Sequence, residues 1–528
     1  MRTVSTHEMR ALELNAEFLG VDRLTLMENA GRAVADQVES CLGSVEGAAV
    51  LVVAGPGNNG GDGFVAARHL ACRGAKVSVV LLARPEDIRT DEARVNYARL
   101  RAMMVSVRVR TAKDAEALEG LRGALEAADV IVDAMLGTGL KGEVREPMRS
   151  AITMVNESRA LKVAVDVPSG LNPDTGEIHG VAVRADVTVT FHAAKPGLLV
   201  EAAKEYVGKL VVADIGIPRE AELVVGPGDF KLVVKPRPRW SHKGDFGRIL
   251  VVGGSKDFSG APALSALAAL RAGADLAVVA SPSSVAQVIR SFSPNLIVRP
   301  LPGDYLAPSH VEELTRLARK STCVVVGPGL GTREETVEAV VELISRVKEE
   351  VKLVVDADGI KAVAKSPSVV SGGRVVLTPH AGEFKLLTGA ALSEEPGERS
   401  EAVAREASRL GAVLLVKGHY DVISDGERVK INVTGNPAMT AGGTGDVLSG
   451  LLAAIASWTD DLFRAACVSA LVNGLAGDMA AERLGNHLTA TDLIEHLPAA
   501  FRELGEGVEL SLGYHMLRAS RHGPPGLT

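Results

Sequence analysis

The 528-residue sequence is poor in aromatic residues, in cysteine and in net positive charge, and each scarcity excludes a class of function. Aromatic residues make up 3% of the chain, which argues against a broad stacking surface for bases or glycans. The formal net charge of −7 gives no basic footprint for nucleic acid. The four cysteines lie far apart without C-x-x-C spacing, so neither a disulfide framework nor a zinc site is indicated. We therefore expect a cytoplasmic protein with no nucleic-acid partner.

Long uncharged apolar runs are also missing. A membrane-spanning helix needs roughly 18 or more such residues, and Arg271 and Asp275 interrupt the best candidate. The first 15 residues, MRTVSTHEMRALELN, have no apolar core of the kind that signal peptides carry. We expect no membrane association.

Glycine, in contrast, is abundant, with 55 residues that often follow short apolar runs. In the first half these runs alternate with helix-like segments, a pattern typical of a parallel sheet covered on both faces. The first helix is predicted to begin at Ser5, which has capping-box spacing to Glu8. The strand-like runs cover residues 48–54, 76–82, 129–136, 161–167, 186–191 and 209–216.

The alternation stops between about 222 and 246, where KPRPRWSHKGDFG is rich in proline and positive charge. We interpret this segment as a domain boundary, although an ordered loop beside a substrate site fits it equally. The alternation restarts at 247, and the small apolar residues of 260–273 predict a helix buried on several sides. Residues 506–528 lack a core pattern and are expected to form a tail. Because the halves are not copies of each other, the sequence predicts a fusion of two α/β domains.

The first site candidate is the glycine-rich stretch GPGNNGGDG, Gly55 to Gly63, between a strand and a helix. Such a turn presents unpaired backbone N–H groups at the positive end of a helix, which suits a phosphate or another anion. A lone G-x-G-x-x-G match is weak. Asn58, Asn59 and Asp62 add polar groups that a tight turn with side-chain caps does not need, although such a turn is the simpler interpretation.

Two aspartates follow neighbouring strand-like runs, at the edge of a sheet where α/β proteins bind ligands. Asp133 precedes GTGLKGEV, and Asp166 precedes Pro168, Ser169 and Gly170. A carboxylate in this position can hold a cation or transfer a proton. Either aspartate alone would more often be a helix cap, but both together beside the glycine loop favour a site.

The runs GPGNNGGDG, DAMLGTGL and DVPSGLN closely resemble the YjeF-type N-terminal domain, an NAD(P)H-hydrate epimerase, over about residues 1–218. The resemblance implies that Asn59, Asp133 and Ser169 hold a potassium ion and that Asp166 is the acid or base at C6 of the nicotinamide ring. The residues implied to bind the hydrated nucleotide, besides Asp166, are Asn58, Asn59, Gly60, Gly61, Asp62, Gly137, Thr138, Gly139, Leu140, Lys141, Gly142 and Glu143.

The second site candidate is the run from Ala441 to Asp446, AGGTGD, which leads into the apolar helix VLSGLLAAI. The N–H groups at such a helix start can stabilise the negative charge of a transferring phosphoryl group. Asp446 can accept a proton from an attacking hydroxyl. The simpler interpretation is a helix cap formed by Thr444 or Asp446.

GTGD resembles the motif of the ribokinase-like superfamily, and VVGPGLG, LTPHAGEF and KGHYD narrow the resemblance to the ADP- or ATP-dependent NAD(P)H-hydrate dehydratase over about 240–500. Mg²⁺ with ADP is implied, and His380 and Glu383 lack the second histidine of a H-E-x-x-H zinc site. The resemblance assigns Ala261, Gly329, His380 and Asp446 to the hydrate, with Asp446 catalytic. It assigns Lys417, Gly418, His419, Tyr420, Asp421, Gly442, Gly443, Thr444 and Gly445 to the adenine nucleotide.

Together the resemblances imply a Rossmann-like three-layer α/β/α domain over 1–222 and a ribokinase-like α/β/α domain over 223–505, followed by the tail 506–528. The first would interconvert R- and S-NADHX and NADPHX, and the second would dehydrate the S epimer at the expense of ADP, giving AMP and phosphate. A homo-oligomer is expected by the same resemblance. Two alternatives stay open. The second half could be a vitamin or sugar kinase, and the first could be a binding scaffold, as in eukaryotic RNA-decapping proteins.

Overall fold

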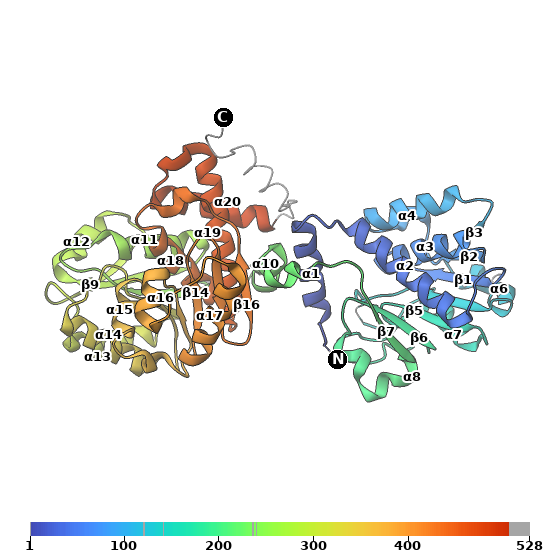
Figure 1. The fold of residues 1–528 in the computed structure, drawn as a ribbon, viewed down its shortest axis with the longest axis horizontal. Helices are drawn as coiled ribbons and strands as arrows, with labels where there is room; N and C mark the ends of the chain where they lie inside the picture. The colour runs from blue at the N-terminus through green and yellow to red at the C-terminus, as the bar shows by residue number, and fades with distance from the viewer. Residues whose placement is uncertain (1, 120–121, 141, 235–236, 239, 506–528) are drawn as a thin grey trace. The chain divides into compact units, whose positions relative to one another are not determined.

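The computed structural model describes residues 2–505 except 120–121, 141, 235–236 and 239, and these residues form two compact units (Figure 1). The division falls between Pro218 and Arg219. The expected tail, residues 506–528, and the predicted ligand-binding residue Lys141 lie outside the described residues.

The first unit is built on a seven-stranded parallel sheet of order β3-β2-β1-β4-β5-β6-β7. The parallel sheet predicted from the apolar runs is confirmed, but β3 was not predicted. Its sequence VRVRT alternates valine with arginine, because β3 is an edge strand with one solvated face. The strands are β1 (Ala49–Ala54), β2 (Lys76–Leu81), β3 (Val107–Thr111), β4 (Val130–Ala134), β5 (Leu161–Val165), β6 (Val187–Phe191) and β7 (Lys209–Ala213).

Helices cover both faces of this sheet, and α1 begins with the predicted capping box between Ser5 and Glu8. One face carries α2, α3 and α4, and the other carries α5, α6 and α7 over a core that includes Leu51 and Ile131. The helices are α1 (Thr6–Phe18), α2 (Arg23–Leu42), α3 (Asn58–Cys72), α4 (Asp91–Ala102), α5 (Ala115–Glu119), α6 (Arg122–Glu126), α7 (Met148–Glu157) and α8 (Lys204–Val207).

The second unit has a nine-stranded sheet of order β10-β9-β8-β11-β12-β13-β14-β15-β16, parallel from β10 to β14. The parallel part matches the apolar runs of the sequence, whereas the antiparallel pair β15 and β16 was not predicted. The strands are β8 (Arg248–Val252), β9 (Leu276–Pro282), β10 (Ile297–Leu301), β11 (Cys323–Val326), β12 (Lys352–Val355), β13 (Val375–Leu377), β14 (Val413–Val416), β15 (Asp421–Ser424) and β16 (Val429–Asn432).

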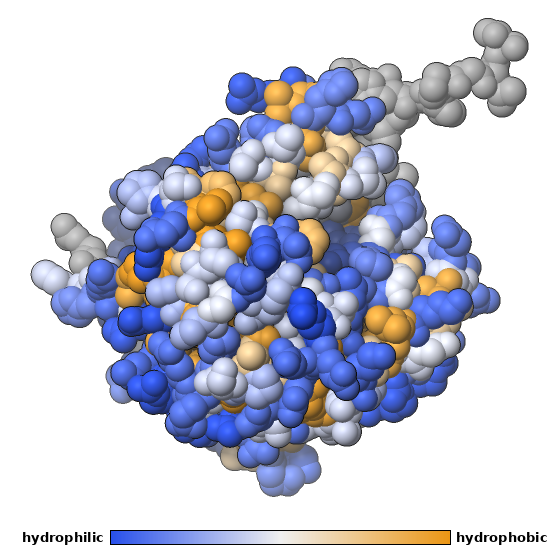
Figure 2. Space-filling view, turned by 90° about the vertical axis from the view of Figure 1, so that its left-hand side faces the viewer, coloured by the Kyte–Doolittle hydropathy of each residue, from blue (hydrophilic) through white to orange (hydrophobic). Residues whose placement is uncertain are grey.

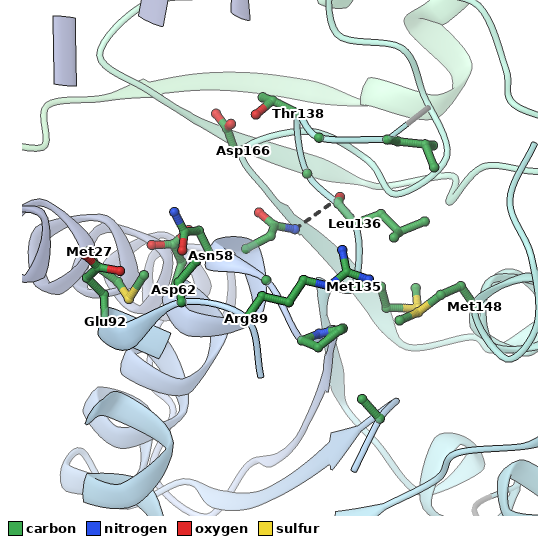
Figure 3. A pocket seen from close by; sticks show the side chains of 18 of the residues that line it. Met27, Asn58, Asp62, Arg89, Glu92, Met135, Leu136, Thr138, Met148 and Asp166 are labelled. Carbon is green, nitrogen blue, oxygen red and sulfur yellow. Dashed lines mark hydrogen bonds between the residues drawn. The ribbon is translucent and has the colours of Figure 1, made fainter. Parts of the chain in front are cut away.

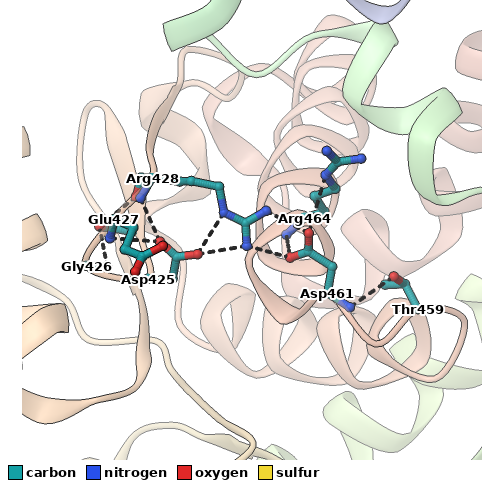
Figure 4. Close-up of polar contacts among 8 residues, drawn as sticks. Asp425, Gly426, Glu427, Arg428, Thr459, Asp461 and Arg464 are labelled. Atoms are coloured by element: carbon teal, nitrogen blue, oxygen red, sulfur yellow. Dashed lines mark hydrogen bonds and ion pairs between the residues drawn. The ribbon is translucent and has the colours of Figure 1, made fainter. Parts of the chain in front are cut away.

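Arg428 fixes the turn between β15 and β16 (Figure 4). Its guanidinium donates to Asp425 at 2.8 Å within the turn and to Asp461 at 2.7 and 3.0 Å. Asp461 is also the N-terminal cap of α19 (Leu462–Leu484), where it accepts a hydrogen bond from the backbone of Arg464. One arginine therefore ties the hairpin to the helix that covers it.

The helix predicted over 260–273 is α11, and its close packing is confirmed. A Cβ on Gly450 of α18 would overlap the carbonyl oxygen of Ser265, so the two helices touch along their backbones. A cluster that includes Leu314, Leu343 and Val403 fills the other face of the sheet. The helices of this unit are α9 (Glu220–Leu223), α10 (Pro227–Val233), α11 (Gly260–Ala272), α12 (Ser283–Ser291), α13 (Val311–Ala318), α14 (Glu334–Val347), α15 (Asp358–Val363), α16 (Ala381–Thr388), α17 (Pro396–Leu410), α18 (Thr444–Ala456), α19 (Leu462–Leu484) and α20 (Ala490–Gly505).

The segment 222–246, interpreted as a domain boundary or an ordered loop, contains the helix α10 (Pro227–Val233), which was not predicted. This part of the chain belongs to the second unit, where Val225 donates to the carbonyl oxygen of Ile431 at 2.9 Å and Lys430 pairs with Asp229 at 2.8 Å. The remaining regular pieces are 3₁₀ turns at Pro85–Asp87, Pro196–Leu199, Glu201–Ala203, Pro308–His310, Pro367–Val370, Pro437–Thr440 and Gly485–His487.

The surface of the second unit drawn in Figure 2 is mostly hydrophilic, and its hydrophobic side chains lie in small separate patches. Within the part of the chain that the structure describes, no helix combines the length and the apolar character that crossing a bilayer requires.

Candidate active sites

The glycine loop of the first unit brings the start of α3 against the end of β1. A Cβ on Gly60 would overlap the carbonyl oxygen of Gly55, and one on Gly63 would lie 2.5 Å from the Cβ of Ala134, so only glycine allows this approach. The sheet order reverses between β1 and β4, and α/β proteins bind ligands outside the carboxyl ends of the strands at such a point. The loop therefore places the N-terminal turn of α3 where a ligand is expected.

A cavity of about 1400 Å³ opens at this edge of the sheet (Figure 3). Asn58 and Asp62 from α3 face it together with Thr138 and Asp166. Of the residues predicted to bind the nucleotide, those that line it are Asn58, Asn59, Asp62, Gly137, Thr138, Gly139, Leu140, Glu143 and Asp166. Gly60, Gly61 and Gly142 do not line it; Gly60 and Gly61 are buried inside the packing of α3.

The three predicted potassium ligands lie close together: Asn59 lines the cavity, and Asp133 and Ser169 are buried. Asp133 is fully buried and accepts hydrogen bonds from the hydroxyl of Ser169 at 2.5 Å and from its backbone N–H at 2.8 Å. Asn59 donates to the carbonyl oxygen of Leu136 at 3.2 Å, and the Ser169 hydroxyl lies 3.2 Å from that same oxygen. The structure therefore brings carboxylate, hydroxyl and carbonyl oxygens together, with the Asn59 amide beside them.

Burial raises the pKa of Asp133 to about 6, and hydrogen bonds from Ser169 and Met135 oppose that rise. Among the described residues, no cationic side chain pairs with this carboxylate. A buried carboxylate without a counter-charge, surrounded by neutral oxygens, fits a hard cation such as K⁺.

Asp166 is held by a lysine that the sequence analysis missed. Lys195 is fully buried, and its Nζ lies 2.5 Å from Asp166 Oδ1, 3.0 Å from Thr190 Oγ1 and 3.1 Å from the carbonyl oxygen of Phe191. Asp166 has a left-handed backbone, with φ of 61°, which aspartate tolerates better than most residues. The only signal in the sequence is a lysine shortly after the strand-like run 186–191.

Two more carboxyl groups share this cavity. Burial and the negative charge of Asp166 raise the pKa of Glu13, in α1, to about 7. Burial, Asp166 and Glu13 together raise the pKa of Asp62 well above its ordinary value. With Lys195 balancing Asp166, the cavity holds carboxyl groups that can carry a proton near neutral pH.

Asp446 lies in the first turn of α18. This helix begins directly after Gly443, whose φ is 94°. Burial raises the pKa of Asp446 to about 7, and the charge of Asp356 adds to the rise. Lys417 opposes it. A group with this pKa can accept a proton at neutral pH and still release it.

Asp356, just after β12, was not among the predicted site residues. It is 1% exposed, and its Oδ1 lies 2.9 Å from Lys417 Nζ and 2.8 Å from Thr378 Oγ1. A Cβ on Gly445 would lie 3.3 Å from Lys417 Nζ and 3.9 Å from Asp356 Oδ2. The pair therefore adjoins the GTGD turn, and Lys417, predicted to contact the nucleotide, reaches the place where a phosphoryl group would meet the helix start.

The other predicted residues of this unit lie around the same edge of the sheet. His380 caps α16 through Nδ1, which accepts from the N–H groups of Gly382 and Glu383, and its backbone bridges that of Lys417. A Cβ on Gly329 would lie 3.5 Å from that of Ala261, so these two predicted residues are neighbours.

The segment from Lys417 to Asp421, predicted to contact the nucleotide, closes on itself. Gly418 donates to Asp421 at 3.1 Å, and the rings of His419 and Tyr420 lie 4.4 Å apart. Thr444 donates to the carbonyl oxygen of Met439 at 2.8 Å, which holds the Gly442–Gly445 turn in place.

Each unit thus has a glycine-rich strand-to-helix or loop-to-helix turn with carboxyl groups of raised pKa beside it, the architecture of a two-site α/β enzyme. Residues 23–197 match the family described as YjeF-related protein N-terminus, and residues 249–499 match the NAD(P)H-hydrate dehydratase family.

The chain is 53% identical over 502 residues to the bifunctional NAD(P)H-hydrate repair enzyme Nnr of Pyrobaculum aerophilum, covering 95% of this chain and 98% of that one. It is 45% identical over 525 residues to the Nnr of Hyperthermus butylicus, covering 98% and 96%. The chain belongs to the family of bifunctional NAD(P)H-hydrate repair enzymes.

Among solved structures, the ADP/ATP-dependent NAD(P)H-hydrate dehydratase of Bacillus subtilis co-crystallised with ATP and Mg²⁺ is 26% identical, with a TM-score of 0.46. It covers 53% of this chain and 98% of its own.

Proposed function

We propose that the first unit interconverts the R and S epimers of NADHX and NADPHX, and that the second dehydrates the S epimer with ADP, giving NAD(P)H, AMP and phosphate. The observation that carries this assignment is the pair of separate sites, one around Asp166 and one around Asp446. Family membership supports the pairing of the two activities in one chain.

For epimerisation, the oxygen on C6 of the hydrated ring must leave one face and return on the other. The ring nitrogen's lone pair expels the hydroxyl, which leaves as water after taking a proton from a carboxylic acid, and water then adds to the other face and gives a proton back. Asp166 is our candidate for this proton transfer. Lys195 and Thr190 hold its Oδ1, and the carboxylate still reaches the cavity, with 14% of its side-chain surface exposed.

Asn59, Asp133 and Ser169 would hold a potassium ion beneath the cavity. Its positive charge would balance the buried Asp133 and keep the loop after β4, which carries Gly137 to Leu140, in place under the nucleotide.

For dehydration, Asp446 takes the proton from the C6 hydroxyl as that oxygen attacks the terminal phosphorus of ADP and AMP leaves. Phosphate is a much better leaving group than hydroxide, and the ring nitrogen expels it from C6. Loss of a C5 proton then restores the dihydropyridine. We assign stabilisation of the transferring group to the N–H groups at the start of α18, which follows Gly443, and to the ammonium of Lys417, which adjoins Gly445.

Mg²⁺ would enter with ADP. The structure fits this arrangement better than a protein cage, because the described residues contain no ready cluster of three His, Cys, Asp or Glu side chains that could hold a metal. Magnesium is commonly bound by one or two carboxylates plus substrate phosphates, and it neutralises developing charge during transfer. A cytoplasmic location and a homo-oligomeric state stay predictions of the same proposal.

The product of the second unit tests the proposal against the kinase alternative. S-NADHX with ADP and Mg²⁺ should yield equimolar inorganic phosphate and NADH, the latter measured by its absorbance at 340 nm. A stable phosphorylated alcohol without that absorbance would assign the unit to the kinases. If pure R-NADHX is converted to NADH only at the rate of its spontaneous epimerisation, the first unit is a binding scaffold.

A further inference from the structure

The cavity of the first unit extends to both sides of the glycine loop. Asp166 follows β5, which lies on the β4 side of β1, whereas Arg84 and Arg89 follow β2 on the opposite side. Lys113 follows β3, one strand further out. All four residues line the same cavity, so a ligand bound at Asp166 has room to continue past the glycine loop towards three cations.

Two of these cations have no ion pair among the described residues. No carboxylate lies within ion-pair distance of Arg89 or Lys113, although both are exposed to the cavity. Arg84 donates to Asp87 at 2.8 and 2.9 Å, but this pair lies on the surface, where such pairs contribute little and exchange readily. Arg84 can therefore turn towards an anionic ligand.

A hydroxyl in the same wall also lacks a partner. Thr90 Oγ1 is buried and makes no hydrogen bond with any described residue, and Thr90 lines the cavity beside Arg89. The backbone N–H of Arg89 donates to the carbonyl oxygen of Pro56 at 2.9 Å, which ties this segment to the glycine loop. Figure 3 shows the Arg89 side chain extending into the cavity, away from Glu92, an acidic residue of the same wall.

The position of these groups in the sheet has a chemical meaning. In dinucleotide-binding α/β sheets, the end of the second strand meets the ribose of the adenosine half. An acidic residue there hydrogen-bonds the 2′-hydroxyl, whereas an arginine accommodates a 2′-phosphate. Here β2 ends at Leu81 and is followed by Leu82, Ala83 and Arg84. The next acidic residues of this loop, Glu86 and Asp87, both pair with Arg84.

We propose that Arg84, Arg89 and Lys113, with the hydroxyl of Thr90, form a subsite for the 2′-phosphate of the substrate, and that the first unit therefore prefers NADPHX to NADHX. This inference rests on the proposed epimerase function, because it names the better substrate of that site. The three cations complement a dianionic phosphate, and the Thr90 hydroxyl supplies a neutral hydrogen-bond donor to a phosphate oxygen.

The test measures epimerisation in the full-length protein without ADP, so that the second unit has no phosphoryl donor. Pure S-NADPHX or S-NADHX is supplied, and formation of the R epimer is followed by chromatography. We expect the wild type to have the lower KM for NADPHX. Arg89→Ala and Lys113→Ala should each raise the KM for NADPHX on the order of tenfold, the size expected for a lost charged hydrogen bond, and leave that for NADHX within about twofold. Arg94→Ala, an exposed arginine of α4 that pairs with Asp91 and does not line the cavity, is the matched control and should change neither KM.

Equal losses with both substrates would overturn the inference and assign Arg89 to the diphosphate shared by both. Unchanged values in both variants would overturn it as well. A binding measurement separates this failure from failure of the epimerase proposal. Wild-type protein saturated with ADP should bind adenosine 2′,5′-bisphosphate more tightly than AMP, and Arg89→Ala should lose that difference. If the wild type shows no such difference, the subsite is absent whether or not the protein epimerises its substrate.

Discussion

The ammonium of Lys195 lies 2.5 Å from Oδ1 of Asp166, and the lysine is completely buried whereas the carboxylate reaches the cavity. A buried lysine is strongly unfavourable unless its charge is balanced. The ammonium of Lys195 also donates to Thr190 and to the backbone carbonyl of Phe191, so its three N–H donors are all satisfied. The lysine and the candidate catalytic carboxylate are therefore one structural unit.

The pairing predicts how substitutions of Asp166 affect stability. Asp166→Asn should destabilise the first unit by about 3–5 kcal/mol, because removing one partner leaves a buried charge uncompensated. The double variant Asp166→Asn, Lys195→Met should lose much less, since the buried charge is gone too. Denaturant unfolding of the three proteins measures both values. Equal destabilisation in the single and double variants would show that the pair is not coupled.

The oxygen cluster beneath the cavity predicts a specific potassium response. Epimerisation by the wild type should rise with KCl at constant ionic strength, with choline chloride as the balancing salt. Asn59→Ala, Asp133→Ala and Ser169→Ala should each weaken this response, because Asp133→Ala removes the buried carboxylate and the other two remove a polar group beside it. If the rate of every variant responds to KCl as the wild type does, the potassium ion does not bind at these three residues.

The raised pKa of Asp446 predicts the pH dependence of dehydration. The base must be ionised to accept the hydroxyl proton, so the rate should fall about tenfold per pH unit below about pH 7 and level off above it. Asp356→Asn removes a negative charge that raises the pKa of Asp446, so the acidic limb should move to lower pH. A rate profile for S-NADHX measured from pH 5 to 9 checks both statements. If the acidic limb of the rate profile stays at the same pH in Asp356→Asn, a group other than Asp446 determines the pH dependence.

The raised pKa of Glu13 predicts a pH dependence of stability. Its pKa is about 7 in the folded protein and near 4.5 when unfolded, so between these values the folded state binds a proton that the unfolded state releases. This contribution is complete below about pH 4.5 and is lost as the pH rises towards 7. Glu13→Gln should remove that part of the decline in the unfolding free energy of the first unit. Glu17→Gln, on the same helix and paired with Arg23, is the control and should leave the decline unchanged.

The sequence predicted the strand-to-helix framework because the first sheet and the β10–β14 part of the second are parallel and covered on both faces, so their buried strands are continuous apolar runs. It missed β3, whose arginines alternate with valine, and the antiparallel pair β15 and β16. β3 and β16 are edge strands, and their partial burial weakens the apolar signal. β15 lies between β14 and β16, and its run DVIS has only two apolar residues, Val422 and Ile423.

The candidate sites follow the same division. Residues inside glycine motifs, such as Asn59 and Asp446, could be found because the motif fixes their backbone locally. Lys195, Glu13 and Asp356 were missed, since their importance comes from partners 29, 153 and 61 residues away in the sequence, namely Asp166 for the first two and Lys417 for the third. Only the fold brings these charges together.

The most direct test of the account supplies pure R-NADHX, ADP and Mg²⁺ to the full-length protein and follows absorbance at 340 nm. The account predicts complete conversion to NADH by the wild type, at a rate well above spontaneous epimerisation. Asp166→Ala should stall on this substrate and still convert S-NADHX, whereas Asp446→Ala should form no NADH from either epimer. Rapid conversion of R-NADHX by Asp166→Ala, or of S-NADHX by Asp446→Ala, would contradict the assignment of one activity to each unit.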